Sequence, residues 1–124
     1  MLIHEDITNQ IIASAIEVHK EIGPGLLESA YQECLCRELS LRTVPFIREA
    51  PIAIAYKGIH LDCGYRIDLL VADAVVVEIK SIDEIIPIHE AQLLTYLKLS
   101  RKKVGLLINF NVPLLKDGIK RRVL

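Results

Sequence analysis

The chain has 124 residues, of which 52% are hydrophobic and 25% are charged, and its net charge is −1. This length suits one globular domain over residues 1–124, and this composition excludes an intrinsically disordered chain. No apolar run approaches the roughly 20 residues of a membrane span, and the start, His4-Glu5-Asp6, lacks the positive charge that opens a secretory signal. We therefore expect neither a membrane protein nor a secreted one.

The small net charge conceals an uneven distribution of charge along the chain. Residues 1–97 carry 7 basic and 15 acidic side chains, whereas residues 98–124 carry 8 basic side chains and one acidic. This division suggests a surface that binds a polyanion near the C-terminus, beside an acidic site that attracts cations. A solvated basic tail is the alternative interpretation.

Three cysteines, Cys34, Cys36 and Cys63, cannot all pair within one chain. Cys34 and Cys36 lie two apart in a predicted helix, so they point to different faces and would make a poor metal clamp. We expect the cysteines to behave as small buried apolar residues in a reduced, cytoplasmic protein.

The N-terminal part of the chain is predicted to be helical. Apolar residues recur at spacings of three and four over residues 5–22, which predicts an amphipathic helix. The sequence Gly23-Pro24-Gly25 ends that helix, and a second helix is predicted from Leu26 to about Ser40.

The middle of the chain is predicted to form three strands. Alternating apolar residues predict the first over 47–56, where Pro51 indicates a sheet edge or a bulge. The second and third strands, around 64–71 and 74–80, are joined by a tight connection. The third contains a β-branched run that is typical of a central strand.

The C-terminal part combines one helix with two strands. Pro87 starts a helix that reaches Leu99, residues 104–110 form a buried strand, and residues 119–123 form a last short strand. The resulting order, α, α, β, β, β, α, β, β, predicts an α/β fold in which a mixed β-sheet is flanked by helices.

Asp68, Glu78 and Lys80 are conspicuous because they interrupt apolar strands, where charged groups are costly to bury. Strand alternation places Glu78 and Lys80 on one face. A three-residue loop at 72–74 would place Asp68 opposite Glu78, whereas a two-residue loop would separate the two carboxylates unless a bulge restored the register.

A pair of carboxylates in this arrangement suits Mg²⁺ or Mn²⁺. A lysine beside them could orient a water molecule or stabilise charge on a phosphate. The alternative is a structural ion pair of Lys80 with Asp68 or with Glu78 at a strand end. The residues alone leave both interpretations open.

Other polar residues lie on the predicted helices. Glu28 follows Gly25 at the start of the second helix, where a carboxylate can also serve the helix dipole alone. Gln92 and Tyr96 are four apart, so they are neighbours on one helical face and could reach a phosphate or form a surface pair. His89 could line the same cleft, although a lone histidine more often has a structural role.

Asp68 followed ten residues later by Glu78-x-Lys80 resembles the signature of the PD-(D/E)XK nuclease superfamily. Ile67 stands where the name of that superfamily has a proline, a departure that does not involve a metal ligand.

Two more motifs add to the resemblance. Glu28 and the pair Gln92-x-x-x-Tyr96 look like the additions found in the RecB-like exonuclease branch of the superfamily. The motif Gly25-x-x-Glu28-x-x-Tyr31 resembles the one that names the GxxExxY proteins, a small bacterial and archaeal family within it. The resemblance extends over nearly the whole chain.

The resemblance implies a restriction-endonuclease-like fold with the core order αβββαβ. It also implies a nuclease that hydrolyses phosphodiester bonds, with DNA as substrate, Mg²⁺ or Mn²⁺ as cofactor, and a role in repair, recombination or defence. The implied metal ligands are the carboxylates of Asp68 and Glu78 and the carbonyl of Ile79, with Glu28 bound directly or through water.

The resemblance also assigns roles to other polar residues. Lys80 would position the attacking water, and Gln92 and Tyr96 would support the metal shell and the substrate phosphate. A C-terminal basic surface would hold the nucleic-acid backbone without reading bases, and it would consist of Lys98, Arg101, Lys102, Lys103, Lys120, Arg121 and Arg122.

Two other functions are compatible with the same sequence. One is a non-catalytic nucleic-acid-binding module on the same fold, and the other is an interaction subunit whose apolar surface serves oligomerisation. A homodimer or a larger protein partner could complete a substrate groove in a chain of this size. The sequence does not decide whether the substrate is DNA or RNA, or whether it is single- or double-stranded. It also does not decide whether cutting is internal or starts from an end.

Overall fold

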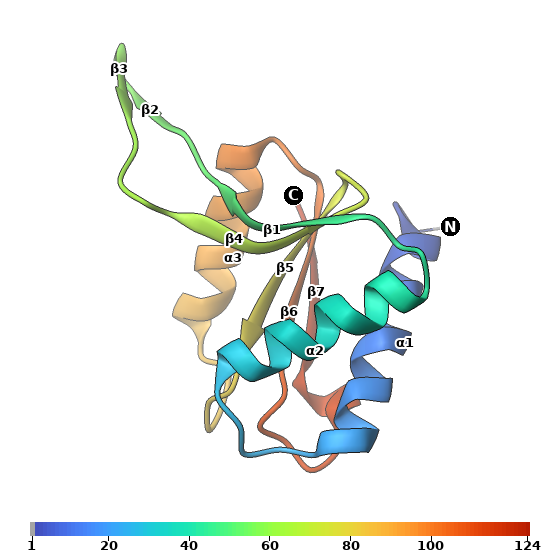
Figure 1. The fold of residues 1–124 in the computed structure, drawn as a ribbon. Coiled ribbons are helices and arrows are strands. Elements are labelled where there is room, and N and C mark those ends of the chain that lie inside the picture. Colours follow the sequence, from blue (N-terminus) through green and yellow to red (C-terminus); the bar gives the residue numbers. More distant parts are fainter. Residues whose placement is uncertain (1) are drawn as a thin grey trace.

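The computed structural model describes residues 2–124. Its elements, in chain order, are α1 (Glu5–Ile22), α2 (Glu28–Leu41), β1 (Phe46–Pro51), β2 (Ile54–Tyr56), β3 (Ile59–Leu61), β4 (Arg66–Val71), β5 (Val75–Lys80), α3 (Pro87–Ser100), β6 (Val104–Asn109), a 3-10 helix η1 (Leu115–Gly118) and β7 (Ile119–Val123). Five strands form one sheet in the order β1-β4-β5-β6-β7, and β2 and β3 form a separate hairpin. In Figure 1, α1 and α2 cover one face of the large sheet and α3 covers the other.

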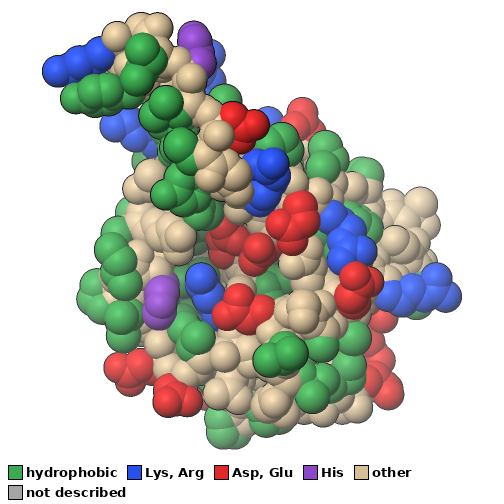
Figure 2. All heavy atoms as spheres, turned by 60° about the vertical axis from the view of Figure 1, so that its left-hand side comes forward, with side chains coloured by type: hydrophobic (Ala, Val, Ile, Leu, Met, Phe, Trp, Pro, Cys, Tyr) green, Lys and Arg blue, Asp and Glu red, His purple; other side chains and the backbone are tan. Residues whose placement is uncertain are grey.

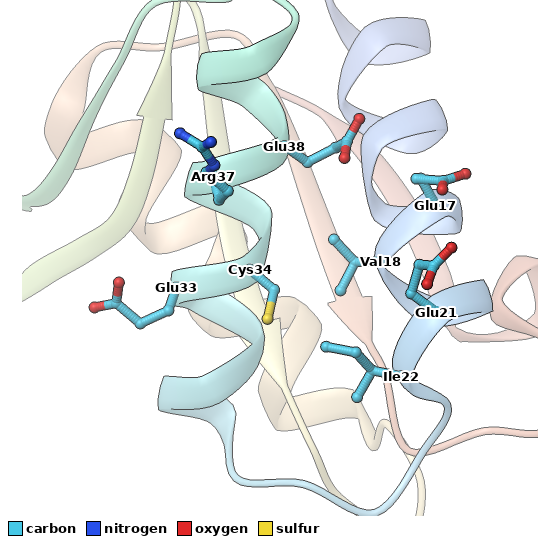
Figure 3. Close-up of a pocket in the computed structure, with 8 residues that line it drawn as sticks. All are labelled: Glu17, Val18, Glu21, Ile22, Glu33, Cys34, Arg37 and Glu38. Carbon is cyan, nitrogen blue, oxygen red and sulfur yellow. The ribbon is translucent and has the colours of Figure 1, made fainter.

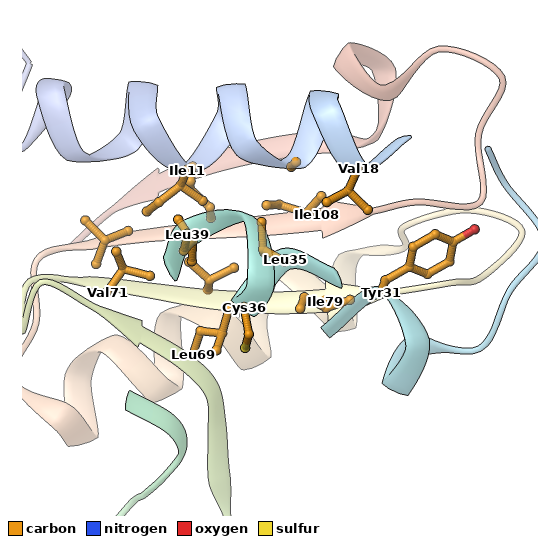
Figure 4. Packing of buried hydrophobic residues seen from close by; sticks show 14 of the residues in the cluster. Ile11, Val18, Tyr31, Leu35, Cys36, Leu39, Leu69, Val71, Ile79 and Ile108 are labelled. Atoms are coloured by element: carbon orange, nitrogen blue, oxygen red, sulfur yellow. The ribbon is translucent and has the colours of Figure 1, made fainter. Parts of the chain in front are cut away.

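The alternation of side chains along the strands produces a hydrophobic core on each face of the sheet. Val77 and Ile79 of β5 pack in the larger core with Ile11 and Leu35, which come from α1 and α2 (Figure 4). Val76 points to the other face and packs in the smaller core beneath α3. Because both faces are covered, the central strands are apolar nearly throughout.

The predicted mixed sheet is confirmed, with β5 at its centre. β4 is antiparallel to β5 on one side, and β6 is parallel to β5 on the other. A parallel pair needs a crossover connection, and α3 supplies it. Without the β2-β3 hairpin, the order α2, β1, β4, β5, α3, β6 is the implied core order αβββαβ.

The connection between β4 and β5 has the length that brings the two carboxylates to the same level. Val71 pairs with Val75 across a three-residue loop at 72–74. With this register, Asp68 stands opposite Glu78, as the first of the two loop lengths predicts.

The single strand expected over 47–56 is wrong, because this segment forms two strands in different sheets. β1 ends at Pro51, and the chain then forms the β2-β3 hairpin, which projects from the body of the molecule (Figure 1). Lys57 and Gly58 at its tip have φ angles of 47° and 89°, the pattern of a type I′ turn. Alternation continues across Pro51, so periodicity alone does not reveal the break.

Smaller differences concern a helix start and a cysteine. α2 begins at Glu28 rather than at Leu26, because the backbone of Leu27 is extended. Cys36 is buried and Cys34 half-buried, but Cys63 is exposed in the loop before β4, so the expected burial of that residue is wrong. All three thiols are free. Among residues 2–124, no helix combines the length and apolar character that a membrane span requires.

Candidate active site

Asp68 and Glu78 lie together where strands β4 and β5 diverge. The main-chain pairing of the two strands ends at Leu69 and Val77, and beyond this point the carboxylates act as acceptors. The amide of Asp68 donates to Oε2 of Glu78 over 3.3 Å, and the amide of Ile79 donates to Oδ2 of Asp68 over 2.8 Å. Each carboxylate therefore holds the backbone beside the other, and the two acids are kept close together.

The electrostatics of this pair are dominated by Glu78, whose side chain is buried with 8% of the residue exposed. Burial, followed by the negative charge of Asp68 and a hydrogen bond with it, raises the pKa of Glu78 to about 9. Lys80 opposes this rise. Two neighbouring carboxylates in a buried place cannot both ionise cheaply, so the pair favours binding a proton or a cation.

Lys80 extends from the same strand, two residues after Glu78, and is half-buried. Within residues 2–124, no salt bridge joins its ammonium group to Asp68 or Glu78. The structural ion pair of Lys80 with Asp68 or Glu78 therefore does not form. The lysine is close enough to lower the pKa of Glu78 and has its charge available to another group.

The segment Gly25–Tyr31 is locked in place by the Tyr31 side chain. The buried Tyr31 ring stacks on Phe110, with 4.5 Å between the ring centres. Its hydroxyl donates to the carbonyl of Gly23 over 2.6 Å and accepts from the amide of Leu26 over 3.2 Å. Gly25 has a φ of 101°, a backbone conformation that favours glycine. The glycine and the tyrosine of the motif thus shape the connection between α1 and α2.

This connection delivers Glu28 to the end of β5. Oε2 of Glu28 accepts a hydrogen bond of 3.4 Å from the amide of Ser81, which directly follows Lys80. The Ser81 hydroxyl donates to the carbonyl of Leu26 and strengthens the contact. The structure therefore brings Glu28 to the end of the strand that carries Glu78 and Lys80, next to Ser81, which is 53 residues away in the sequence.

Helix α3, which covers the face of the sheet opposite α2, contributes Gln92 and Tyr96. The predicted contact between them forms, because the Gln92 amide donates to the Tyr96 hydroxyl over 3.0 Å. Burial and the negative charge of Glu78 raise the pKa of Tyr96, which places this phenol in the electrostatic field of the carboxylate pair. His89 has a structural role here, since its Nδ1 accepts from the amide of Ile86 at the start of α3.

The oxygen atoms at this site fit a hard divalent cation. Mg²⁺ is commonly held by one or two carboxylates together with water and substrate phosphates, and Asp68 and Glu78 supply such a pair. Among residues 2–124, no group of three or more acidic, histidine or cysteine side chains is arranged to hold a metal ion. Glu28 does not complete a three-carboxylate cluster, and its role as a ligand, like that of the Ile79 carbonyl, stays a prediction.

The surface around the site is hollowed and charged. Figure 2 shows the side of the molecule that carries the projecting hairpin, where acidic side chains gather with a basic one in a hollow below that hairpin. A cationic cofactor and an anionic substrate would meet complementary charges there.

Most of the predicted basic surface lies at the opposite end of the sheet. β6 runs parallel to β5, so Lys103, which precedes β6, is next to the start of β5 and far from Lys80. Lys102 pairs with Asp73 in the β4-β5 loop over 3.1 Å. Lys98 and Arg101 lie at the C-terminal end of α3, which leads to the same end of the sheet.

The remaining basic residues lie on the edge strand β7. Arg122 pairs with Glu90 of α3, and Arg121 donates to the carbonyl of Ile3. Lys120 pairs in register with Leu107, which places it level with the active-site part of β5 but two strands away. The structure thus does not gather these cations around the carboxylates, and their contact with nucleic acid stays a prediction.

Asn109 is a buried polar residue that the sequence analysis missed. Its Oδ1 accepts from the amide of Ile82 over 3.1 Å, and its Nδ2 donates to the carbonyl of Ile82 over 3.0 Å. It therefore holds the segment that follows Lys80. A polar residue at the end of an otherwise apolar strand is the signal that could have identified it.

Glu49 is a second residue next to the site that the sequence analysis missed. It lies in β1 between residues that pair with Leu69 and Ile67, so it is level with Asp68. Its φ is 50°, and its Oε1 accepts from the Gln32 amide over 2.8 Å. No sequence pattern distinguishes it from any other exposed glutamate.

A separate pocket of about 300 Å³ lies between α1 and α2. Figure 3 shows its lining, which includes Glu17, Glu21, Glu33 and Arg37. None of the predicted catalytic or metal-binding residues lines this pocket. The chemistry implied by the sequence therefore does not belong to this pocket.

The comparisons with known proteins identify the family. Curated proteins and solved structures gave no significant match. A family model described as the PD-(D/E)XK nuclease superfamily matches residues 5–122, a range that contains the diverging strands, the helix with Gln92 and Tyr96, and the Glu28 segment. The five-stranded mixed sheet between helices agrees with the restriction-endonuclease-like fold. With this match over nearly its full length, the chain belongs to the PD-(D/E)XK nuclease superfamily.

Proposed function

We propose that this protein is a metal-dependent nuclease that hydrolyses phosphodiester bonds, with DNA as its substrate and Mg²⁺ or Mn²⁺ as its cofactor. The observation that carries the proposal is the pair of half-buried Asp68 and buried Glu78, each bonded to the backbone beside the other. Beside them lies Lys80, whose ammonium group forms no salt bridge within residues 2–124. The superfamily supports it, because nuclease activity is general among its members.

Asp68 and Glu78 would hold the cation, with the Ile79 carbonyl and Glu28 as further ligands. A divalent cation at this position supplies Lewis-acid stabilisation of the phosphate and a lower pKa for attacking water. The Lys80 ammonium stabilises the negative charge that develops on the phosphate and orients the water. The oxygen of water bonds to phosphorus as the bond from phosphorus to the leaving oxygen breaks. The proton that the water loses balances the one that the leaving oxygen takes up, so the products are a phosphate monoester and an alcohol.

Gln92 and Tyr96 act on the substrate phosphate in this proposal. Because the Gln92 amide donates to the Tyr96 oxygen, the phenolic proton remains available to a phosphate oxygen. The raised pKa of Tyr96 keeps that proton in place at neutral pH. The pair is thus a neutral donor next to a negatively charged centre.

The motif Gly25-x-x-Glu28-x-x-Tyr31 supports placing the chain in the GxxExxY family and the RecB-like branch. Its three named residues have separable tasks, since Gly25 and Tyr31 shape the loop and Glu28 reaches the end of β5. We propose one catalytic domain over residues 1–124. Roles in repair, recombination or defence, and a cytoplasmic location, stay predictions from the sequence.

Nuclease assays test the proposal directly. The purified protein is incubated with linear, circular and single-stranded DNA and with RNA, in Mg²⁺ or Mn²⁺. We expect cleavage of DNA, lowered at least about 100-fold in the double variant Glu78→Ala, Lys80→Ala, because the variant lacks both charge stabilisation and a metal ligand. A matched double variant on α1, Glu17→Ala, Lys20→Ala, should cut as the wild type does.

Three results would contradict the proposal. Cleavage that persists in the Glu78, Lys80 variant would come from another site or a contaminant. Equal binding without cleavage by both proteins would support the non-catalytic binding module, and a protein that neither binds nor cuts would support the interaction subunit.

A further inference from the structure

A cleft of about 330 Å³ opens beside the candidate active site, between α3 and the base of the projecting hairpin. Ile54 and Tyr65 line it from the hairpin side, and Ile88, Thr95 and Leu99 line it from α3. Its volume is at the lower end of the roughly 300–1,000 Å³ range of small-molecule sites. The cleft is therefore large enough for one small group and not for a folded partner.

Tyr96 connects this cleft to the catalytic centre. Its ring lines the cleft, while its hydroxyl accepts from Gln92 and lies in the field of Glu78. Gln92 lines the cleft as well. A group in the cleft would therefore be adjacent to a phosphate held by Tyr96, Lys80 and the carboxylate pair.

The side chains that line the cleft suit a ligand that is flat, uncharged and partly polar. Within residues 2–124, none of the side chains that line the cleft is charged, so a phosphate would find no counter-ion there. Tyr65 is 48% exposed and presents an aromatic ring, on which a base can stack. The Thr95 hydroxyl and the Gln92 side-chain oxygen have no hydrogen-bond partner among these residues, and they could bind the polar edge of a base.

We propose that this cleft binds one unstacked nucleobase of the strand whose phosphate is held at the active site. This inference rests on the proposed function and narrows the substrate. A base inside a duplex is stacked and paired, so a strand that enters the cleft must be single-stranded or have an unpaired base beside the cleaved phosphate. Unpaired ends and single strands are the substrate class that the cleft selects.

A titration followed by nuclear magnetic resonance tests the inference without cleavage. Labelled protein in Mg²⁺ is titrated with thymidine 5′-monophosphate and, separately, with deoxyribose 5-phosphate, which lacks the base. We expect the nucleotide to shift the backbone amide signals of Tyr65, Ile88 and Leu99, which line the cleft and have no proposed contact with the phosphate. The sugar phosphate should shift signals around Asp68, Lys80, Gln92 and Tyr96 but not those three. Equal shifts of Tyr65, Ile88 and Leu99 by both compounds, or no shift of them by the nucleotide, overturn the inference.

Two cleft variants provide the second arm of the test. Ala91 lines the cleft from the exposed side of α3, so Ala91→Phe fills the space without removing a catalytic group. It should weaken nucleotide affinity at least tenfold, whereas Asn9→Phe at an exposed position of α1 should leave that affinity unchanged. Tyr65→Ala, at a half-exposed loop position, should weaken it several-fold. Unchanged affinity in the folded Ala91 and Tyr65 variants overturns the inference.

The outcomes separate this inference from the proposed function. If the nucleotide binds in the cleft but no nucleic acid is cut, the cleft is supported and the nuclease is not. If single strands are cut but the nucleotide does not shift the amide signals of the cleft residues, the nuclease proposal is supported and the proposed base site is wrong. Signals of residues 91–99 that move with protein concentration alone would identify a second copy as the occupant and overturn the base assignment.

Discussion

Glu78 is the residue in which the conflict between fold and chemistry is greatest. A β-strand at the centre of the sheet is buried on both faces, and a carboxylate there loses its hydration. The nearby Asp68 adds repulsion rather than compensation. A residue that costs stability in a central strand is better explained by what it binds than by what it packs against.

The raised pKa of Glu78 predicts how stability depends on pH in metal-free protein. The pKa of Glu78 is about 9 in the folded state and about 4.5 in the unfolded chain, so the folded state binds this proton more tightly. The stabilising contribution of that proton is therefore fully present below pH 4.5 and is lost as the pH rises toward 9. Glu78→Gln cannot ionise and should stabilise the protein at pH 8 by on the order of 1–3 kcal/mol. Urea unfolding at pH 4.5 and pH 8 measures this.

Glu21→Gln, at an exposed position on α1, is the control, and it should leave the pH dependence unchanged. A wild-type protein as stable at pH 8 as Glu78→Gln would show that the Glu78 carboxylate is ionised at little cost.

Metal ions should reverse this loss of stability. A ligand that binds only the folded state stabilises it by about 2.7 kcal/mol at 100 times its dissociation constant. Mn²⁺ should therefore raise the melting temperature of the wild type at pH 8, and a chelator should cancel the rise. Asp68→Asn should lose most of the rise, because it removes one of the two carboxylates that the structure places together. An equal rise in both proteins would locate the metal elsewhere.

Among the elements, the α1-α2 connection has the clearest division of tasks. The connection contains neither a strand nor a helix, yet it determines where Glu28 lies. The Tyr31 hydroxyl closes the loop by bonding Gly23 and Leu26, and Ser81 ties the loop to β5. The loop thus holds the Glu28 side chain at the end of β5.

Removal of the Tyr31 hydroxyl tests this role. Tyr31→Phe keeps the ring stacked on Phe110 but loses two hydrogen bonds in a buried place, so it should cost about 1–2 kcal/mol of unfolding free energy. We also expect slower cleavage, because Glu28 loses its position at the end of β5. Denaturation and cleavage rates are compared with Tyr56→Phe, whose ring is exposed on the hairpin. Normal cleavage by Tyr31→Phe would exclude a catalytic contribution from the loop geometry.

At the scale of the whole molecule, most of the predicted basic surface and the carboxylates of Asp68 and Glu78 lie at different ends of the sheet. Lys102 and Lys103 lie near the start of β5, and Glu78 and Lys80 lie near its end. This separation suits a phosphate backbone that is held at several points along its length.

Binding assays at several salt concentrations test this arrangement. Arg101→Ala, Lys103→Ala removes two exposed cations that form no salt bridge among residues 2–124. The variant should bind nucleic acid more weakly for all sequences, and each lost phosphate contact should reduce the salt slope by about 0.9. Lys20→Ala on α1 is the control. An unchanged salt slope would exclude this end of the sheet from the binding surface.

Local patterns account for the helices and the central strands, and they allow the carboxylate pair. The spacing of apolar residues predicts the three helices and the central strands, because periodicity reflects which side of each element is buried. A three-residue β4-β5 loop, one of two lengths compatible with the sequence, then places Asp68 opposite Glu78. The β2-β3 hairpin was missed because neither of its short strands is long enough to show a period.

The sequence by itself determined the fold class, the three helices and the central strands, because these depend on the pattern of neighbours along each element. Only the tertiary structure decided the pKa of Glu78, the contact of Glu28 with Ser81, the cleft against Tyr65 and the remoteness of the basic residues. Those features depend on burial and on distances between segments far apart in the chain. Such distances are determined by the packing of α2 and α3 on opposite faces of the sheet, which no local pattern encodes.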